Sequence, residues 1–280
     1  MKLVRYRSAT GEKPGLVLDG EVFDLSGSFS PLHPRPPTFA DIEAIAAMPT
    51  KSLTKIPRDT VLGPPLRGIG KIIGVGLNYH DHAEEVGLPL PKEPTLFLKA
   101  TSALCGPTYD LVMPREAKSV DWEVELGVVI GKPGVYIAER DALDHVLGYC
   151  VGIDFSERDF QYNRGGQGFK GKSSDTFAPL GPFLATSDEI ADPQKLSMRL
   201  SVNGELKQSG TTRDMIYSVA ELVSYISRFM SLQPGDVILT GTPAGVGHGQ
   251  KPPVFLQPGD VVTASIEGLG EQTHQVVASG

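Results

Sequence analysis

The sequence predicts a β-rich α+β fold in which a few helices cover the sheets and a small N-terminal domain precedes a larger one. Two observations support this prediction. Most apolar residues lie in short runs bounded by Gly and Pro, and few stretches have helical periodicity. The runs expected to be strands of the larger domain are 72–75, 95–99, 120–130, 146–153, 196–202, 236–240 and 261–266.

Residues 1–70 are predicted to form the small N-terminal domain. Strand-like pieces occur at 3–6, 16–18 and 22–25, a Pro-rich stretch follows at 31–37, and a short helix is expected at 41–48. The segment 57–70 is rich in residues that interrupt regular structure, namely Pro57, Gly63, Pro64, Pro65, Gly68 and Gly70. We therefore place the domain boundary there, with the larger domain at 71–280.

The clearest helical pattern runs from Val219 to Met230. Its apolar residues recur at helical spacing and form one stripe, which is typical of a helix packed on a sheet. Ser218, with Glu221 three residues later, predicts a capping box at its start. This helix is expected to cover part of the sheet.

Charge and hydropathy narrow the class of protein. The net charge of -7, with Lys and Arg scattered among acids, argues against a nucleic-acid surface or an anionic membrane as partner. No run of about 18 apolar residues occurs. We expect a cytoplasmic protein that acts on a small soluble molecule. Cys105 and Cys150 lack metal-site spacing and are expected to be buried thiols.

Three acids indicate a metal site. On a strand, Glu123 and Glu125 would point to the same face, and Asp154 follows the apolar run 147–153. Convergent carboxylates about 4 Å apart repel by about 4 kcal/mol per pair at an effective dielectric near 20, so a cluster needs a cation or a proton. All-oxygen ligands favour Mg2+, Mn2+ or Ca2+ over zinc. Spacing alone leaves the alternative open that the Glu pair lies on a solvated outer face.

The segment 78–87 contains a candidate general base. Asp81 can cap a short helix that Gly87 ends, and within it His82 and Glu85 share one face. A carboxylate beside an imidazole fixes its tautomer and raises its basicity. The alternatives are an ordinary surface pair, or a zinc half-site of His80 and His82 that lacks further ligands.

One motif is misleading. Residues 166–173 match the phosphate-loop pattern GxxxxGK[ST], but such a loop needs a buried strand before it and a helix after it. Polar residues fill 156–164, while Pro179 and Pro182 oppose a following helix. We therefore interpret Lys172 without this motif, as a loop residue that on its own would be a solvated charge. A nucleotide-binding protein remains the rival from another class.

Six segments, in order, resemble the fumarylacetoacetate hydrolase family over about residues 71–270. They are GVGLNYHDH (74–82), LFLK (96–99), VDWEVELGVVIG (120–131), DFSERDFQ (154–161), GKSSDTFAPLGP (171–182) and TGTPAGVG (240–247). The resemblance implies a mixed β-sandwich roll, a homodimer, and Mg2+ or Mn2+ held by Glu123, Glu125 and Asp154.

The same resemblance implies roles for further residues. His82 and Glu85 are similar to the family's water-activating dyad, and Lys172 resembles the lysine that stabilises developing negative charge. The residues implied in holding the substrate or ordering the site are Lys99, Arg158, Gln161 and Thr242.

Within the family, the sequence most resembles hydrolases that cleave 2,4-diketo-3-deoxy-L-rhamnonate, or the related fuconate, to pyruvate and lactate. The features that carry this narrower resemblance are the start MKLVRY, the early EKPGL and DLSG, and residues 156–158 and 164–166. The alternatives are ureidoglycolate lyase, acylpyruvase, and oxaloacetate decarboxylase or tautomerase. The expected substrate is in most of these cases a small 2-keto acid.

Overall fold

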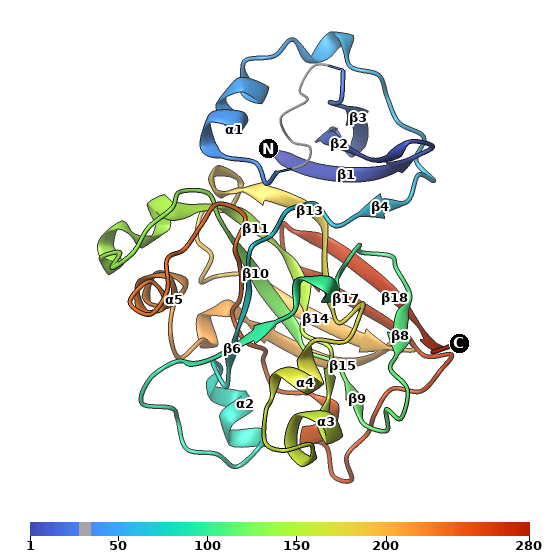
Figure 1. Ribbon diagram of the computed structural model, residues 1–280, viewed down its shortest axis with the longest axis vertical. Helices are drawn as coiled ribbons and strands as arrows, with labels where there is room; N and C mark the ends of the chain where they lie inside the picture. Colours follow the sequence, from blue (N-terminus) through green and yellow to red (C-terminus); the bar gives the residue numbers. More distant parts are fainter. Residues whose placement is uncertain (28–34) are drawn as a thin grey trace.

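The structure, a computed structural model, describes residues 1–27 and 35–280. It has the predicted β-rich α+β fold, with mixed sheets and short helices (Figure 1). Within this described part, the largest sheet has eleven strands. Its main path is β3 (Glu21–Asp24), β2 (Gly11–Leu18), β1 (Lys2–Ser8), β13 (Ala178–Thr186), β11 (Val146–Ile153), β10 (Val124–Ile130), β16 (Val237–Leu239), β5 (Ile72–Gly76) and β6 (Thr95–Lys99). Beside it, β4 (Leu62–Gly63) pairs with β1, and β7 (Leu104–Cys105) pairs with β13.

A second sheet packs against the first. Its order is β15 (Glu205–Thr211), β14 (Ser197–Val202), β17 (Val261–Ile266), β18 (Gly270–Ala278) and β8 (Leu111–Met113). A small ladder joins β12 (Ser156–Glu157) to β9 (Val120–Asp121). Every residue of β10 and β11 is buried, because these central strands are covered on both faces. The two sheets therefore enclose one apolar core that includes Cys150, and both Cys105 and Cys150 are buried free thiols.

The helices are short. They are α1 (Phe39–Ala46), α2 (His80–Glu85), α3 (Arg158–Asn163), α4 (Phe169–Lys172) and α5 (Val219–Ile226). In Figure 1, α2, α3 and α4 gather at the end of the molecule opposite the N-terminal strands. The candidate site lies at that end. Among the described residues, no helix is long and apolar enough to cross a membrane.

The strand predictions hold best where an apolar run is short and uninterrupted. The predicted strands 95–99, 146–153 and 261–266 have the bounds of β6, β11 and β17. The run 120–130 was wrongly predicted as one strand, since it breaks between β9 and β10 at Trp122 and Glu123. At this break the Val124 amide donates to the Gln208 side chain (3.0 Å) instead of to a neighbouring strand.

The helix predicted at 219–230 is shorter than expected. The capping box of Ser218 and Glu221 is present, but α5 ends at Ile226. Ser227 stops it, because its hydroxyl donates to the Ser224 carbonyl (2.7 Å) and accepts from the Ile137 amide (2.8 Å). Beyond α5, Phe229 is 63% exposed, whereas Met230 still packs against the core.

Several strands escaped prediction, among them β13, which contains Pro179 and Pro182. Proline is tolerated in a sheet at irregular positions. Here the pairing of β13 with β11 shifts register between Tyr149 and Val151, which leaves room for it. The remaining strands absent from the prediction are β4, β7, β8, β12, β15 and β18.

The N-terminal strands continue the main sheet. Lys2 and Leu3 of β1 pair with Ala185 and Leu184 of β13. Helix α1 begins at Phe39, two residues earlier than predicted, because Thr38 and Asp41 form its capping box. The Pro-rich stretch 31–37 lies partly outside the described residues. The domain boundary near residue 70 stays a prediction.

Candidate metal centre and active site

Three carboxylates converge as the sequence predicts. Glu123, Glu125 and Asp154 each offer an oxygen within 4.8 Å of the others, and all three residues are buried. The convergence follows from strand pairing: Val124 lies opposite Ile153, so the residues beside them meet across the ladder, and the Asp154 amide donates to the Glu123 carbonyl (2.9 Å). The solvated outer face that spacing left open is therefore wrong.

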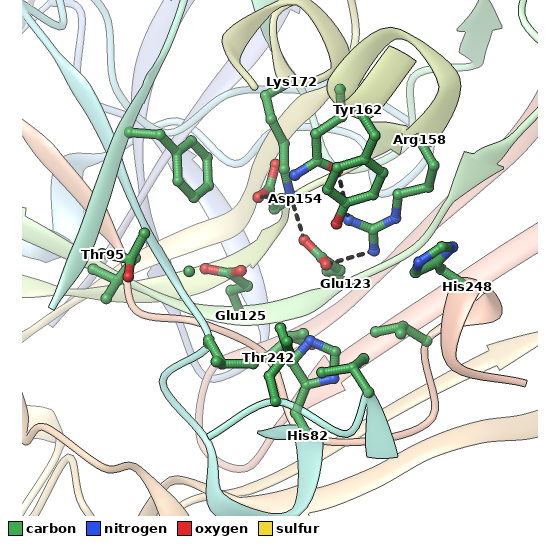
Figure 2. Close-up of a pocket in the computed structure, with 18 residues that line it drawn as sticks. His82, Thr95, Glu123, Glu125, Asp154, Arg158, Tyr162, Lys172, Thr242 and His248 are labelled. Carbon is green, nitrogen blue, oxygen red and sulfur yellow. Dashed lines mark hydrogen bonds and ion pairs between the residues drawn. The ribbon is translucent and has the colours of Figure 1, made fainter. Parts of the chain in front are cut away.

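The acids line a cavity of about 560 Å3. Figure 2 shows them at its centre, with His82 and Thr242 on one side and Arg158 and Lys172 on another. Of the ten residues proposed from sequence for the site, eight line this cavity, namely His82, Glu123, Glu125, Asp154, Arg158, Gln161, Lys172 and Thr242. Glu85 and Lys99 lie behind it and reach it through their contacts with His82 and Asp154.

Two buried lysines bind the acids. The Lys172 ammonium donates to Glu123 Oε2 (2.7 Å) and Asp154 Oδ2 (2.5 Å), while Lys99 donates to Asp154 Oδ1 and to the Phe155 carbonyl (3.1 Å). Burial alone would lower the pKa of Lys172, but the carboxylates of Asp154 and Glu123 outweigh it and hold that pKa above its ordinary value. The prediction of a loop lysine was wrong, since Lys172 ends α4 and is only 3% exposed.

Arg158 is held by an acid that sequence reasoning missed. Its Nε and Nη2 donate to Asp121 Oδ2 (2.9 and 2.8 Å), and Nη2 also donates to Glu123 Oε1 (2.6 Å). Nη1 donates to Gln161 Oε1 (3.0 Å). Helix α3 begins at Arg158 because the Glu157 carboxylate caps it through the Phe160 amide (2.6 Å). The available signal for Asp121 was an acid near the start of the predicted strand 120–130.

The predicted dyad is formed. His82 Nδ1 lies 3.0 Å from Glu85 Oε2, and Glu85 Oε1 accepts from the Gly245 amide (2.9 Å). Helix α2 begins at His80, so Asp81 is not its cap as predicted but lies in its first turn, where its carboxylate accepts from the His82 amide (2.8 Å). Gly87 ends it with a φ of 67°, a conformation that favours glycine. With Nδ1 directed at Glu85, Nε2 is the nitrogen left for a reactant.

Thr242 orders the floor of the site. Its hydroxyl donates to the Val124 carbonyl (2.8 Å) and accepts from Gln208 Nε2 (2.8 Å). The preceding amide, of Gly241, donates to Glu125 Oε2 (2.8 Å). These contacts fix β10 against the 240–243 turn.

Glu125 shows why the residues fit a divalent cation. Burial and the neighbouring carboxylates of Asp154 and Glu123 raise the pKa of Glu125 well above its ordinary value. Among the residues that the structure describes, no Lys, Arg or His forms an ion pair with it. A cation bound by the three acids would relieve this repulsion. A donor set of carboxylate oxygens alone favours Mg2+ or Mn2+ over zinc.

Three aromatic side chains of the cavity, those of Phe97, Tyr162 and His248, were absent from the predicted site. Tyr162 and His248 line it with ring centroids 5.5 Å apart. Asp121 holds the loop that carries His248, accepting from the amides of Gly247 (2.6 Å) and His248 (2.9 Å). No local pattern marks either residue, because the two are brought together from distant parts of the chain.

The phosphate-loop pattern at 166–173 has no matching structure. It follows helix α3 and contains helix α4, which has only four residues before the chain continues to β13. The lysine of the pattern, Lys172, instead donates hydrogen bonds to Glu123 and Asp154. The structure thus agrees with setting this motif aside.

Comparison with known proteins confirms the family that the six segments indicated. The family model described as fumarylacetoacetate (FAA) hydrolase C-terminal matches residues 71–277. A protein of Burkholderia multivorans, named as a hydrolase without a substrate, is 49% identical over 274 residues, with 97% of each chain covered.

Solved structures agree over 100% of both chains. Fumarylacetoacetate hydrolase from Exiguobacterium antarcticum has a TM-score of 0.87 at 36% identity. Maleylpyruvate hydrolase from Sphingobium sp. SYK-6, solved with manganese(II) and pyruvate, has 0.81 at 33%. A 5-carboxymethyl-2-hydroxymuconate delta-isomerase from Mycobacterium smegmatis has 0.79 at 34%. These similarities show an enzyme fold shared by hydrolases and isomerases.

Proposed function

The chain belongs to the fumarylacetoacetate hydrolase family, and from this premise we propose that it is a Mg2+- or Mn2+-dependent hydrolase that cleaves a 2,4-diketo acid between C3 and C4. The observation that carries the proposal is that the acidic triad and His82 line the same cavity. A similar enzyme was solved with manganese(II) and pyruvate, the product expected from such a cleavage.

Each step has a residue to perform it. His82, oriented by Glu85, takes a proton from water as the water oxygen adds to C4. The C3–C4 bond breaks, its electron pair passes to the pyruvate unit as an enolate, and C3 regains a proton. C4 leaves as the carboxylate of the second product. Lys172 lies beside the triad, where its ammonium stabilises the enolate charge. A bound divalent cation supplies Lewis-acid stabilisation of the same charge.

The remaining site residues have supporting roles in this proposal. Arg158, Gln161 and Thr242 order the cavity wall and hold the substrate, and Lys99 holds Asp154 in place. We propose a homodimer as the working form. The substrate proposed from sequence is 2,4-diketo-3-deoxy-L-rhamnonate or the related fuconate, giving pyruvate and lactate.

A substrate panel tests the reaction class. We expect pyruvate release from 2,4-diketo acids with Mg2+ or Mn2+, and its loss after treatment with a chelator. Oxaloacetate and ureidoglycolate serve as the competing substrates. Undiminished turnover of 2,4-diketo acids in thoroughly demetallated protein would contradict the metal-dependent mechanism, and preference for either competitor would replace the proposed reaction.

A further inference from the structure

The cations of the cavity are already paired. Among the described residues that line it, the only lysine and arginine are Lys172 and Arg158. Lys172 forms ion pairs with Glu123 and Asp154, and Arg158 forms them with Asp121 and Glu123. The cavity therefore offers no unpaired Lys or Arg to a second carboxylate of a substrate.

Neutral hydrogen-bonding groups at the mouth, in contrast, are unused. The amide nitrogen of Gln161, the hydroxyl of Tyr162 and the ring nitrogens of His248 have no hydrogen-bond partner among the residues that the structure describes. Their positions are nevertheless set: Arg158 holds the Gln161 carbonyl oxygen, and Asp121 holds the His248 backbone. Tyr162 is 54% exposed, so this group lies at the outer part of the cavity.

These groups lie on the side of the triad where C4 would be attacked. In Figure 2, His82 and His248 are on the Glu123 side, whereas Thr95 is beyond Glu125. A bound substrate would place its reacting end at the triad, with C4 facing His82. Its substituent beyond C4 would then extend toward Tyr162 and His248.

We propose that Gln161, Tyr162 and His248 select a 2,4-diketo acid whose substituent beyond C4 is uncharged and carries a hydroxyl group. The inference rests on the proposed function and adds its specificity residues. The three side chains can donate to and accept from a hydroxyl. A carboxylate in the same place would find no unpaired Lys or Arg among the described residues that line the cavity, and the Glu123 carboxylate, which also lines it, disfavours a like charge there.

Burial and the Arg158 guanidinium lower the pKa of His248, in keeping with a neutral imidazole at this position. A net hydrogen bond is worth about 0.5–1.5 kcal/mol, so two such bonds to one hydroxyl give about the 1.4 kcal/mol that corresponds to a tenfold change. At this partly exposed mouth we therefore expect hydroxyl selection of about tenfold.

Three substrates of the holoenzyme with Mg2+ test the inference. They share the reacting end and differ in the substituent: 5-hydroxy-2,4-dioxohexanoate, which is the rhamnose-derived diketo acid, 2,4-dioxohexanoate without the hydroxyl, and 2,4-dioxoheptanedioate with a second carboxylate. We expect kcat/KM to be highest for the first, about tenfold lower for the second, and lowest for the third. If none is cleaved, the proposed function fails. If the dicarboxylate is preferred, the proposed function stands and this inference is overturned.

Two variants assign the selection to residues. Tyr162→Phe removes one hydroxyl, and His248→Phe removes both ring nitrogens while keeping an aromatic ring against Tyr162. In each we expect the kcat/KM ratio of the hydroxylated to the deoxy substrate to fall toward one. Tyr136→Phe, at an exposed tyrosine outside the cavity, is the matched control and should keep the wild-type ratio. An unchanged ratio in both cavity variants would overturn the assignment.

Discussion

Glu125 differs from the other two acids of the triad. Among the described residues, its carboxylate accepts a hydrogen bond from the Gly241 amide but forms no ion pair, whereas Glu123 is paired with Arg158 and Lys172. We therefore expect Glu125→Gln to weaken Mg2+ binding by at least about tenfold, since even indirect support of a metal ligand is worth about 10- to 100-fold. Titration calorimetry measures this loss of Mg2+ affinity.

Glu125→Gln should also change the stability of the metal-free protein. Because burial and its neighbours raise the pKa of Glu125, ionising it opposes folding in metal-free protein, and Glu125→Gln should unfold at a higher temperature.

Glu123 is a poorer choice for this experiment. Its carboxylate accepts from Arg158 and from Lys172, so Glu123→Gln would both weaken metal binding and leave two buried cations with fewer partners. For the preferred variant, Glu125→Gln, an Mg2+ affinity equal to that of the wild type would show that Glu125 is not a metal ligand.

His82 separates metal binding from catalysis. It pairs with Glu85 and makes no contact with the acid oxygens in the hydrogen bonds that the structure describes. We expect His82→Ala to keep Mg2+ affinity within about twofold and to lose about 10²- to 10⁴-fold in hydrolysis, the usual contribution of a general base. Calorimetry and pyruvate release measure the two effects. Near-normal turnover would exclude His82 as the base.

At the scale of elements, Asp121 joins three pieces of chain around the site. From β9 it binds Arg158 of α3 and the amides of Gly247 and His248. We expect Asp121→Asn to lower the free energy of unfolding by about 3 kcal/mol, because it removes one charge partner of a buried guanidinium. Chemical denaturation measures the loss, and kcat should fall with it as α3 loses its position.

Asp159 provides the matched control for that experiment. It lies on α3, next to Arg158, and pairs with Arg164 at the surface (3.1 Å). Exposed pairs contribute about 0–1 kcal/mol, so Asp159→Asn should unfold nearly as wild type. Equal losses in both variants would show that Asp121 has no special role in the fold.

At the scale of the molecule, ligand binding should stabilise the whole fold, since the triad draws on β10 and β11 at the centre of the main sheet. A ligand at 100 times its Kd adds about 2.7 kcal/mol of stability. For a chain of this size we expect Mg2+ with oxalate to raise Tm by several degrees. ATP without Mg2+ should leave Tm unchanged. A rise in Tm with ATP that exceeds the rise with Mg2+ and oxalate would favour a nucleotide-binding protein.

Much of the fold and the site was predictable where the signal is local. Strands such as β6 and β11 follow from short apolar runs, and the capping box of α5 follows from Ser218 and Glu221. The convergence of the three acids was also predicted, but its evidence was family resemblance as well as spacing. The break at Trp122 was missed, because it depends on Gln208, a residue 84 positions away from Val124.

The sequence by itself determined the β-rich class, the placement of Glu123 and Glu125 on one face and the His82–Glu85 spacing, since each depends on residues within a turn or a strand of one another. Only the tertiary structure decided that Lys172 is buried on the acids, that Asp121 holds Arg158, and that Tyr162 meets His248. The physical reason is that strand pairing brings distant residues together, and the charge and hydrogen-bonding state of a buried group depend on those neighbours.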